Sequence, residues 1–468
     1  MSEHFVFPQD RRLKLANLMK NANRPKPVVE RDLGRIVVAA ASARFLAASS
    51  LRAGRPVSTI DLFADVDTVK TCRQSDQHLF PEQAQNFAWQ CRDTDEVWRR
   101  VEALVSDGDF HGPSGPPVLL IGGGLESYFG NDTTSHVLPG QANPFGSLDV
   151  KQWRHVSEFC SENSIGFPNS SRELDAREFD QGWLVKTDFS SGGLGVQFAQ
   201  ANVSLEPDQF FQKYIDGRST GACYVAAPPA QGEESSLVEL LGVCEPVSSP
   251  EPEVSGQPFP FCYAGSTGPM DPSCLTSTTL TELKRVGSLA ANHFGLAGVF
   301  GIDFILKHDR LWLLEINPRI TASAELIEYA ARETMPEFSI VDLHLSALAG
   351  KVGLESPSIK ACQKAAAGGR IFTKKIVYRH HEAAHVLRVT QACIDALEGH
   401  FGLFVDSGTQ LPASREVLIT DVPKPNTDIE AGQPILTLHV SGETHSHADE
   451  ALVQALDWLE RIVGERFR

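Results

Sequence analysis

Residues 298–317 contain the feature that most constrains the fold of this chain, two apolar, β-rich runs joined by a polar turn. The runs read GVFGIDFIL and LWLLEIN, and the tetrapeptide KHDR separates them. Two such runs around a short polar turn predict a β-hairpin. In this hairpin we expect Asp303 of the first strand to lie roughly opposite Glu315 of the second.

The hairpin would gather hard oxygen ligands on one face. Glu315 and Asn317 are two residues apart, so their side chains share a face of the strand and approach Asp303. Two carboxylates and an amide suit Mg²⁺ when substrate phosphates and water complete its shell, and they are also compatible with Mn²⁺. The alternative is a strand with a polar, solvated face, but the apolar residues that flank this one indicate burial.

Composition restricts the classes of partner. The 468 residues predict about three domains. The 59 acidic and 42 basic residues give a net charge of −17, which argues against nucleic acid or an anionic membrane as the main partner. No apolar run approaches the roughly 20 residues of a membrane span, and the N-terminal residues lack the apolar core of a signal peptide. The nine cysteines include no CxxC pair, which indicates reduced thiols, and we expect a cytoplasmic protein.

The N-terminal third of the chain predicts a parallel sheet. An apolar strand at 35–41, a helix and a second strand at 55–63 form a βαβ pattern. The sequence further predicts a helix over 82–105 and a buried strand at 116–124 that ends on glycines. A Gly-rich turn after a parallel strand allows a ligand to approach the backbone, although glycines also simply end strands.

Residues 182–200 form a second candidate site, made of a strand, a Ser/Gly-rich loop and a returning strand. Lys186 lies at the end of the first strand. The loop that follows contains Ser190, Ser191, Gly192 and Gly193. Backbone amides of such a loop suit a phosphate chain, and the lysine supplies its countercharge. An ordinary glycine hairpin loop is the alternative.

These motifs do not form either of two familiar nucleotide sites, because the chain has neither a GxxxxGK[ST] P-loop nor the HRD and DFG motifs of protein kinases. Taken in order, they resemble the ATP-grasp superfamily of carboxylate–amine ligases over roughly residues 35–455. IDFILKHDRLWLLEINPR resembles the hairpin that carries the magnesium ligands of that superfamily, and E-x-N-x-R is its most specific element. WLVKTDFSSGGLG is similar to the strand and phosphate loop, and QKYIDG to the hinge.

The resemblance implies an ATP site between the loop and the hinge. By analogy, the Gln212 side chain reaches the adenine amino group, and the backbone of Lys213 and Ile215 bonds to the ring edge. Lys151 stands where the family carries an earlier ATP-contacting lysine, although a surface helix lysine is an equally good interpretation. The implied metal ligands are Asp303, Glu315 and Asn317. The residues implied in ATP binding are Lys151, Lys186, Ser190, Ser191, Gly192, Gly193, Gln212, Lys213, Tyr214 and Ile215.

Two departures from the family pattern concern the sugar and the substrate. Ser219 falls near where related ligases carry an acidic ribose contact, so ribose recognition stays open. Gly301 replaces an arginine that D-alanine–D-alanine ligase-like enzymes use to hold the reacting carboxylate. Arg319 is the obvious substitute, because its planar fork suits a carboxylate or an acyl phosphate, and we expect it to act catalytically with Lys186. A salt bridge to a neighbouring acid is the alternative for Arg319.

The expected fold is an α/β ATP-grasp fold with an N-terminal parallel-sheet (pre-ATP-grasp) domain and a small C-terminal α+β domain. The segment TDVPKPNTDIEAGQPILTLHVSG resembles the small last domain of ATP-grasp enzymes related to biotin carboxylase. The expected divisions are a flexible arm at 1–30, a Rossmann-like domain at 31–142, an ATP-grasp domain at 143–360 with a lid at about 165–225, and a C-terminal domain at 361–468.

The resemblance also implies an ADP-forming carbon–nitrogen ligase that uses ATP and magnesium. A small-molecule carboxylate would be activated as an acyl phosphate and attacked by an amine, and a homodimer is compatible with the family. The overall layout is similar to the tyramine–glutamate ligase-like proteins of methanofuran and methylofuran pathways, which suggests a role in the biosynthesis of a C1-carrier cofactor. The alternatives are a carboxylase acting through carboxyphosphate and a non-catalytic ATP-binding protein. The sequence names neither the acid nor the amine.

Two groups of histidines are further metal candidates. One comprises His380, His381 and His385, and the other comprises His439, His445 and His447. Neither group has a cysteine or an acidic partner at a convincing spacing, so solvated or capping histidines are the alternative. The segment at 263–268, YAGSTG, has turn-forming residues and is expected to line the substrate side.

Overall fold

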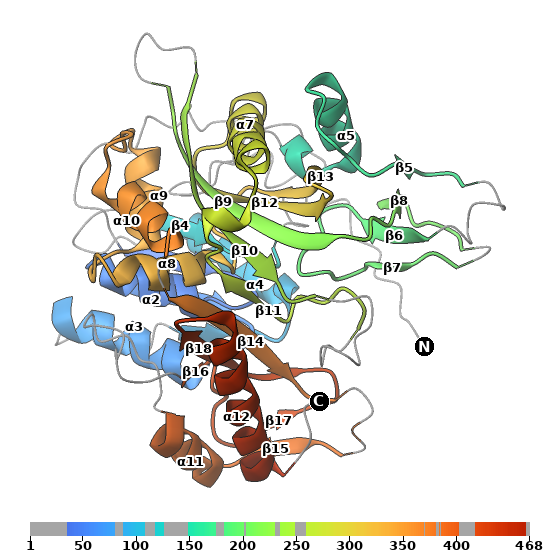
Figure 1. Cartoon of the computed structure of the whole chain (residues 1–468). Coiled ribbons are helices and arrows are strands. Elements are labelled where there is room, and N and C mark those ends of the chain that lie inside the picture. Colours follow the sequence, from blue (N-terminus) through green and yellow to red (C-terminus); the bar gives the residue numbers. More distant parts are fainter. Residues whose placement is uncertain are drawn as a thin grey trace.

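The computed structural model describes residues 35–79, 88–107, 118–125, 148–174, 182–200, 203–229, 235–248, 259–368, 370–380, 383, 385–401 and 417–464. These residues form β-sheets of four, eight, two and four strands with helices packed around them (Figure 1). The arm expected at 1–30 lies outside the described residues. None of the described helices is long and apolar enough to cross a membrane.

The N-terminal sheet is parallel, in the order β3-β2-β1-β4, which confirms the βαβ prediction. Its strands and helices are β1 (Ile36–Ala39), α2 (Arg44–Arg52), β2 (Val57–Asp61), α3 (Val66–Leu79), β3 (Ala88–Gln90), α4 (Thr94–Asp107) and β4 (Val118–Ile121). The chain runs outward from β1 to β2 and β3, and then returns to β4 on the other side of β1. The strand order therefore reverses between β1 and β4, which is where open α/β sheets bind ligands.

The helix predicted over 82–105 is wrong in its first part. Residues 88–90 form strand β3, which pairs with β2, and α4 begins only at Thr94. Asp93 fixes this start, because its Oδ1 accepts a hydrogen bond from the Glu96 backbone N–H at 2.7 Å, as a helix N-cap does. Residues 88–90 form a strand because they pair with the edge of β2. This edge is distant in sequence, so a local sequence pattern does not reveal the pairing.

A small antiparallel sheet projects to one side of the molecule (Figure 1). Its strands lie in the order β5-β8-β6-β7. They are β5 (Ser170–Ser171), β6 (Trp183–Thr187), β7 (Gln197–Phe198) and β8 (Gln209–Lys213), and the short helix η2 (Leu148–Lys151) and α5 (Trp153–Glu162) precede them. The predicted strand, loop and returning strand of residues 182–200 correspond to β6, the glycine loop and β7, which confirms that part of the prediction.

The central sheet has eight strands in the order β13-β12-β9-β10-β11-β14-β18-β16. They are β9 (Arg218–Ala227), β10 (Leu237–Pro246), β11 (Gly265–Gly268), β12 (Gly298–Lys307), β13 (Arg310–Asn317), β14 (Ile371–Tyr378), β16 (Val417–Thr420) and β18 (Pro434–Gly442). The order means that strands of the last hundred residues continue the sheet that holds the predicted hairpin.

Strand β11 connects the two parts of this sheet. It occupies residues for which the sequence predicted a turn, at 263–268, so that prediction is wrong. Its four residues pair with β10 on one edge and with β14 on the other. Gly265 has a φ of 134°, and a Cβ at this position would lie 1.9 Å from the carbonyl oxygen of Lys374. The glycine that looked like a turn signal therefore serves the close approach of two strands.

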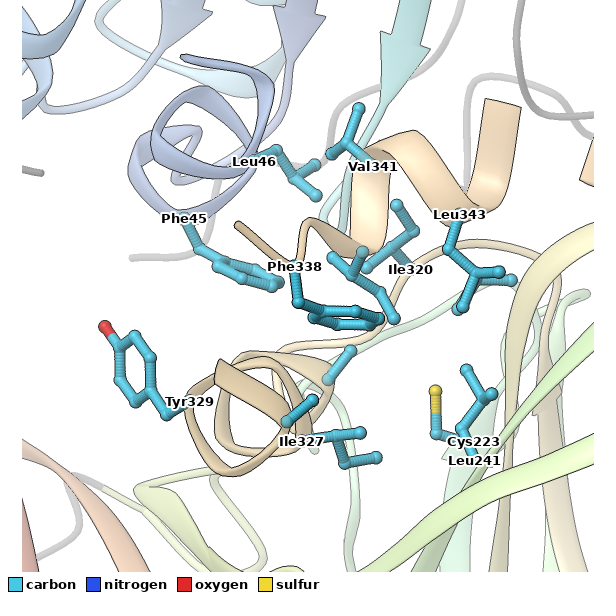
Figure 2. Close-up of a cluster of buried hydrophobic side chains, with 14 of the residues drawn as sticks. Phe45, Leu46, Cys223, Leu241, Ile320, Ile327, Tyr329, Phe338, Val341 and Leu343 are labelled. Atoms are coloured by element: carbon cyan, nitrogen blue, oxygen red, sulfur yellow. The ribbon is translucent and has the colours of Figure 1, made fainter. Parts of the chain in front are cut away.

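Helices cover both faces of the central sheet. On one face α7 (Ser277–Phe294) packs on Tyr224 and Phe300, whose rings stack at 5.2 Å. On the other face lie α8 (Ala324–Arg332), α9 (Ile340–Leu348) and α10 (Pro357–Ala366). Figure 2 shows Phe338 at the centre of this second core, between Phe45 and Leu46 of α2 and the side chains of α8 and α9. This core joins the N-terminal sheet to the central sheet.

The C-terminal part adds a two-stranded sheet of β15 (Leu387–Val389) and β17 (Thr427–Ile429), together with α11 (Gln391–Phe401) and α12 (His445–Val463). A buried ion cluster ties it to the rest. Arg44 Nη2 lies 3.0 Å and Lys374 Nζ 2.8 Å from Glu325 Oε2. Burial opposes the ionised form of Glu325, but Arg44 and then Lys374 outweigh it and hold the pKa well below its usual value. The cluster therefore links α2, α8 and β14.

Candidate active site

The predicted hairpin is confirmed, and Asp303 of β12 pairs directly with Glu315 of β13. The turn between the strands has positive φ at both central residues, 48° at His308 and 59° at Asp309. Two such residues are typical of the type I′ turn, whose twist matches that of the strands. A bulge follows Asp303 in the register. The local sequence therefore fixes the two acids opposite one another.

Asn317 completes a group of three polar side chains on this hairpin. Its Nδ2 donates to Asp303 Oδ2 at 2.9 Å and to Glu315 Oε1 at 3.3 Å. Gly221 of the neighbouring strand β9 leaves room for the group, since a Cβ there would lie 3.2 Å from Asp303 Oδ1. The three expected metal ligands are thus in contact with one another.

Lys151 enters the same group from η2, far away in sequence. Its Nζ donates to Asn317 Oδ1 at 2.9 Å and lies 3.3 Å from Glu315 Oε2. The Lys151 side chain is only 4% exposed, so the interpretation as a surface helix lysine is wrong. The structure therefore brings Lys151 to the hairpin acids, and its contact with ATP stays a prediction.

Lys186 reaches the region from β6 of the small sheet. Its Nζ donates to Gln212 Oε1 at 3.2 Å, and Gln212 Nε2 donates to Ser170 Oγ at 3.1 Å. Burial lowers the pKa of Lys186, and the nearby charge of Glu315 partly restores it. Lys186 is therefore close enough to the hairpin acids to interact electrostatically with them. The sequence pattern did not predict a role for Ser170, because nothing in its neighbourhood marks it as a partner of Gln212.

The two acids of the hairpin have opposite electrostatic environments. Burial, and then the charge of Glu315, raise the pKa of Asp303. Burial also opposes the ionised form of Glu315, but Lys151 and then Lys186 outweigh it and lower its pKa. The Glu315 side chain is 33% exposed, so the group opens toward solvent. A further positive charge between the two carboxylates would offset their repulsion and favour the ionised form of Asp303.

This donor set fits a hard divalent cation. Asp303 and Glu315 supply carboxylate oxygens, and the Asn317 amide supplies a third oxygen once it turns by half a rotation, because its nitrogen faces the acids in the described hydrogen-bond pattern. Within the described ranges, no group of three or more His, Cys, Asp or Glu side chains could hold a metal ion. The hairpin group is not of that kind, because it has only two acids, Asp303 and Glu315, and its third member is the amide Asn317.

The glycine loop between β6 and β7 is shaped by positive φ values at Gly192, Gly193 and Gly195. Ser190 Oγ donates to the Thr187 carbonyl at 2.8 Å, which closes the start of the loop. Ser191 accepts through its carbonyl from Leu194 N–H at 3.2 Å. The loop and Lys186 therefore belong to one small sheet. Phosphate binding by the loop stays a prediction.

The hinge residues lie at the end of β8 and directly after it. Lys213 N–H donates to the Asn169 carbonyl at 2.8 Å, and Tyr214 N–H donates to the Gly182 carbonyl at 3.0 Å. An adenine contact through the Lys213 N–H would require the first of these bonds to open. Ile215 is half-buried. The adenine contacts of Gln212, Lys213 and Ile215 stay predictions.

Arg319 lies against the turn that follows β4 of the N-terminal sheet. A Cβ on Gly123 would lie 3.1 Å from the guanidinium carbon of Arg319. The structure thus brings Arg319 to the glycine run at 122–124, whose role the sequence left open. Gly301 cannot be replaced by an arginine without rearrangement, because even a Cβ there would lie 2.5 Å from Thr321 Cγ2. This contact explains the departure from the family pattern at that position.

The remaining sequence candidates do not join this group. Ser219 of β9 pairs with Ile305 and is half-buried. His439 is buried, and its Nε2 lies 2.9 Å from Thr420 Oγ1. His445 and His447 lie in the first turn of α12, and His381 lies outside the described residues. Neither histidine trio forms a metal group within the part of the chain that the structure describes.

The description "ATP-grasp domain" belongs to the family model that matches residues 152–323 of this chain. Solved structures with the same overall fold align with about nine tenths of this chain. The chain has the ATP-grasp fold. One neighbour is biotin carboxylase from Campylobacter jejuni in complex with an ATP analogue, with 14% identity over 91% of each chain and a TM-score of 0.59. At such a low sequence identity, the similarity establishes a shared fold and does not establish a shared activity.

Two further ATP-grasp structures illustrate the range of the fold. The biotin carboxylase domain dimer of 2-oxoglutarate carboxylase from Hydrogenobacter thermophilus was solved with MgADP, ADP and bicarbonate. It is 12% identical over 92% of this chain and 90% of that one, with a TM-score of 0.59. N5-carboxyaminoimidazole ribonucleotide synthetase from Thermotoga maritima is 12% identical over 90% of this chain and 98% of that one, with a TM-score of 0.53.

Curated relatives match only short parts of this chain. Formate-dependent phosphoribosylglycinamide formyltransferase from Anaeromyxobacter dehalogenans is 34% identical over 71 residues, which are 15% of this chain and 17% of the relative. The carbamoyl phosphate synthase large chain from Helicobacter pylori is 31% identical over 68 residues, which are 14% of this chain and 6% of the relative. The chain thus spans well under two thirds of these relatives.

Proposed function

We propose that this chain is an ADP-forming ligase that joins a small-molecule carboxylate to an amine. A carboxylate oxygen attacks the γ-phosphorus of ATP, which gives an acyl phosphate and ADP. The amine then attacks the acyl carbon and displaces inorganic phosphate, which retains the oxygen of the former carboxylate. The nitrogen loses a proton, and the product is an amide.

One observation carries this proposal, the contact of Lys151 with the Asp303, Glu315 and Asn317 group on the β12–β13 hairpin. The sequence separates Lys151 from Asn317 by 166 residues, and the fold closes the gap to 2.9 Å. Two acids, an amide and a buried lysine at one point suit a polyphosphate and its counterion. An ordinary polar strand face would not bring a distant buried cation to these acids.

The three hairpin residues would hold Mg²⁺, or Mn²⁺, together with the ATP phosphates. The ion would neutralise phosphate charge as the γ-phosphoryl group is transferred. Lys186 and the amides of the 190–195 loop would bind phosphate oxygens, and Gln212 would orient the adenine. Lys151 would also contact the phosphates, because its ammonium already lies beside Glu315 and Asn317, where the ion would hold them.

Arg319 is the proposed carboxylate-binding residue. Its guanidinium lies on Gly123 at the carboxyl end of β4, beside the point where the strand order of the N-terminal sheet reverses. Ligands of open α/β sheets bind at such a point, and a planar guanidinium suits a carboxylate in two-point contact. The substrate would therefore lie between the N-terminal sheet and the hairpin.

A carboxylase that activates bicarbonate as carboxyphosphate is the second candidate. The observation that favours it is the similarity in fold to biotin carboxylases, one of which was solved with bicarbonate. An ATP-binding protein without turnover is the third. A role in methanofuran or methylofuran biosynthesis, a homodimeric state and a cytoplasmic location remain finer parts of the proposal, and they rest on the family resemblance.

ADP release with a panel of amino acids, amines and bicarbonate separates these functions. A ligase releases ADP only with a productive acid, and hydroxylamine in place of the amine traps its acyl phosphate as a hydroxamate. A carboxylase releases ADP with bicarbonate and no organic acid. Tight binding of MgATP without ADP release under any combination would overturn both enzymatic proposals.

A further inference from the structure

The glycine loop at 190–195 lies against a segment from elsewhere in the chain, residues 259–263. Tyr263 N–H donates to the Gly192 carbonyl at 3.0 Å. A Cβ on Gly193 would lie 1.9 Å from the Phe261 carbonyl oxygen, so only glycine fits at this position without a shift. The segment therefore contacts the loop at the backbone of two successive glycines. The same segment leads directly into β11.

Three aromatic rings surround this contact. Phe198 of β7 lies 5.5 Å from Phe261 and 5.6 Å from Tyr214, measured between ring centroids, and Tyr214 lies 6.1 Å from Phe261. The planes are tilted by 59°, 68° and 56°, which are favourable arrangements for aromatic pairs. Two rings belong to the small sheet and its hinge, and the third belongs to the segment before β11. The rings therefore stabilise the loop in the position described, which we call closed.

Phe261 adopts a backbone conformation that is unfavourable for its residue type. Its φ is 61°, in the left-handed region that glycine tolerates and that a bulky side chain does not favour. A glycine at 261 would relieve this strain and lose the ring. For a bulky residue such strain persists only where the surrounding contacts hold the backbone in place.

We propose that Phe261 is a positioning residue that, with Phe198 and Tyr214, holds the 190–195 loop over the phosphates of bound ATP. The proposal rests on the proposed function, because it takes the loop as the phosphate site. ATP binds the closed arrangement, and the aromatic contacts determine how much of the protein is closed before ATP arrives. The contact also connects the loop to β11, the strand that lies between β10 and β14.

The test measures the binding of two nucleotides to the full chain by titration calorimetry. Mg·AMP-PNP presents three phosphates to the loop, and AMP presents only one. In Phe261→Gly we expect the Kd of Mg·AMP-PNP to rise about tenfold, because the phosphate loop loses its support. The Kd of AMP should change less than about twofold, because the hinge backbone at Tyr214 keeps its hydrogen bond to Gly182. The thermal midpoint stays near the wild-type value, since relief of the backbone strain offsets the lost ring contacts. Phe198→Ala, on the other side of the contact, should likewise raise the Kd of Mg·AMP-PNP much more than that of AMP.

Asn426→Gly is the matched control, because Asn426 also has a positive φ, 67°, and lies in an exposed turn of the C-terminal part. It leaves both affinities unchanged. If the wild type binds Mg·AMP-PNP and both aromatic variants bind it equally well, the positioning role is wrong and the proposed function stands. Equal losses for AMP and AMP-PNP also overturn the role, because they indicate general damage to the site. If the wild type binds neither nucleotide, the proposed function itself is wrong, and the role of Phe261 with it.

Discussion

The ammonium of Lys151 and the amide oxygen of Asn317 form a 2.9 Å hydrogen bond across the candidate site. This bond turns the Asn317 nitrogen toward Asp303 and Glu315. A cation that enters between the acids would require the amide to turn and Lys151 to accept a new partner. In the proposed site, Asp303, Glu315 and the turned Asn317 amide would hold the ion, and Lys151 would then be free to contact a phosphate.

Replacing Lys151 by methionine tests this arrangement. The lysine lowers the pKa of Glu315 and would contact phosphate, so the variant should lose about tenfold or more in Mg·AMP-PNP affinity. Lys151→Arg should recover part of the loss. Lys70→Met serves as the control, because Lys70 is exposed and pairs with Glu398 on the surface. Equal affinities in wild type and Lys151→Met would remove Lys151 from the site.

Glu315→Gln should abolish magnesium-dependent turnover and leave the fold intact. The change keeps the shape of the side chain and removes one of two anionic ligands, so ADP formation should fall on the order of a hundredfold. Circular dichroism and thermal unfolding should match the wild type. Glu398→Gln, at the exposed surface, is the matched control. Unchanged activity in Glu315→Gln would refute the metal assignment.

Gly123→Ala should weaken the carboxylate substrate and spare ATP. The new methyl group would lie 3.1 Å from the Arg319 guanidinium carbon, so the guanidinium would have to shift by a few tenths of an ångström. We expect the KM of the carboxylate to rise about tenfold, with little change in the affinity for Mg·AMP-PNP. Gly353→Ala is the control, since a Cβ there meets no atom within 4 Å. A loss of ATP affinity instead would place Arg319 in the nucleotide site.

His439 should make the protein less stable in mild acid. Burial lowers its pKa from 6.5 to about 3, so the folded state keeps this imidazole neutral. The stability from this group is complete above pH 6.5 and is lost as the pH falls from 6.5 toward 3, by ~2 kcal/mol at pH 5. His439→Gln can keep the hydrogen bond to Thr420 and lacks the titration. Urea unfolding at pH 7.5 and pH 5 should show a smaller loss for the variant, and equal losses would contradict the assignment.

The sequence predicted the parts of the site that depend on short distances along the chain. Asp303 and Glu315 oppose each other because one tight turn fixes the register, and Asn317 shares their face because side chains alternate. The βαβ order of the first sheet was readable for the same reason. The segment at 263–268 was misread as a turn, because its glycines serve contacts with distant strands.

The amino-acid sequence by itself determined the hairpin, its two facing acids, the glycine loop and the order in which they follow one another. Only the tertiary structure decided that Lys151 belongs to the acids, that Arg319 lies on Gly123 and that Phe261 holds the glycine loop. Each of these contacts joins segments far apart in the chain. Their positions follow from the packing of whole sheets and helices, and a local pattern of residues does not encode that packing.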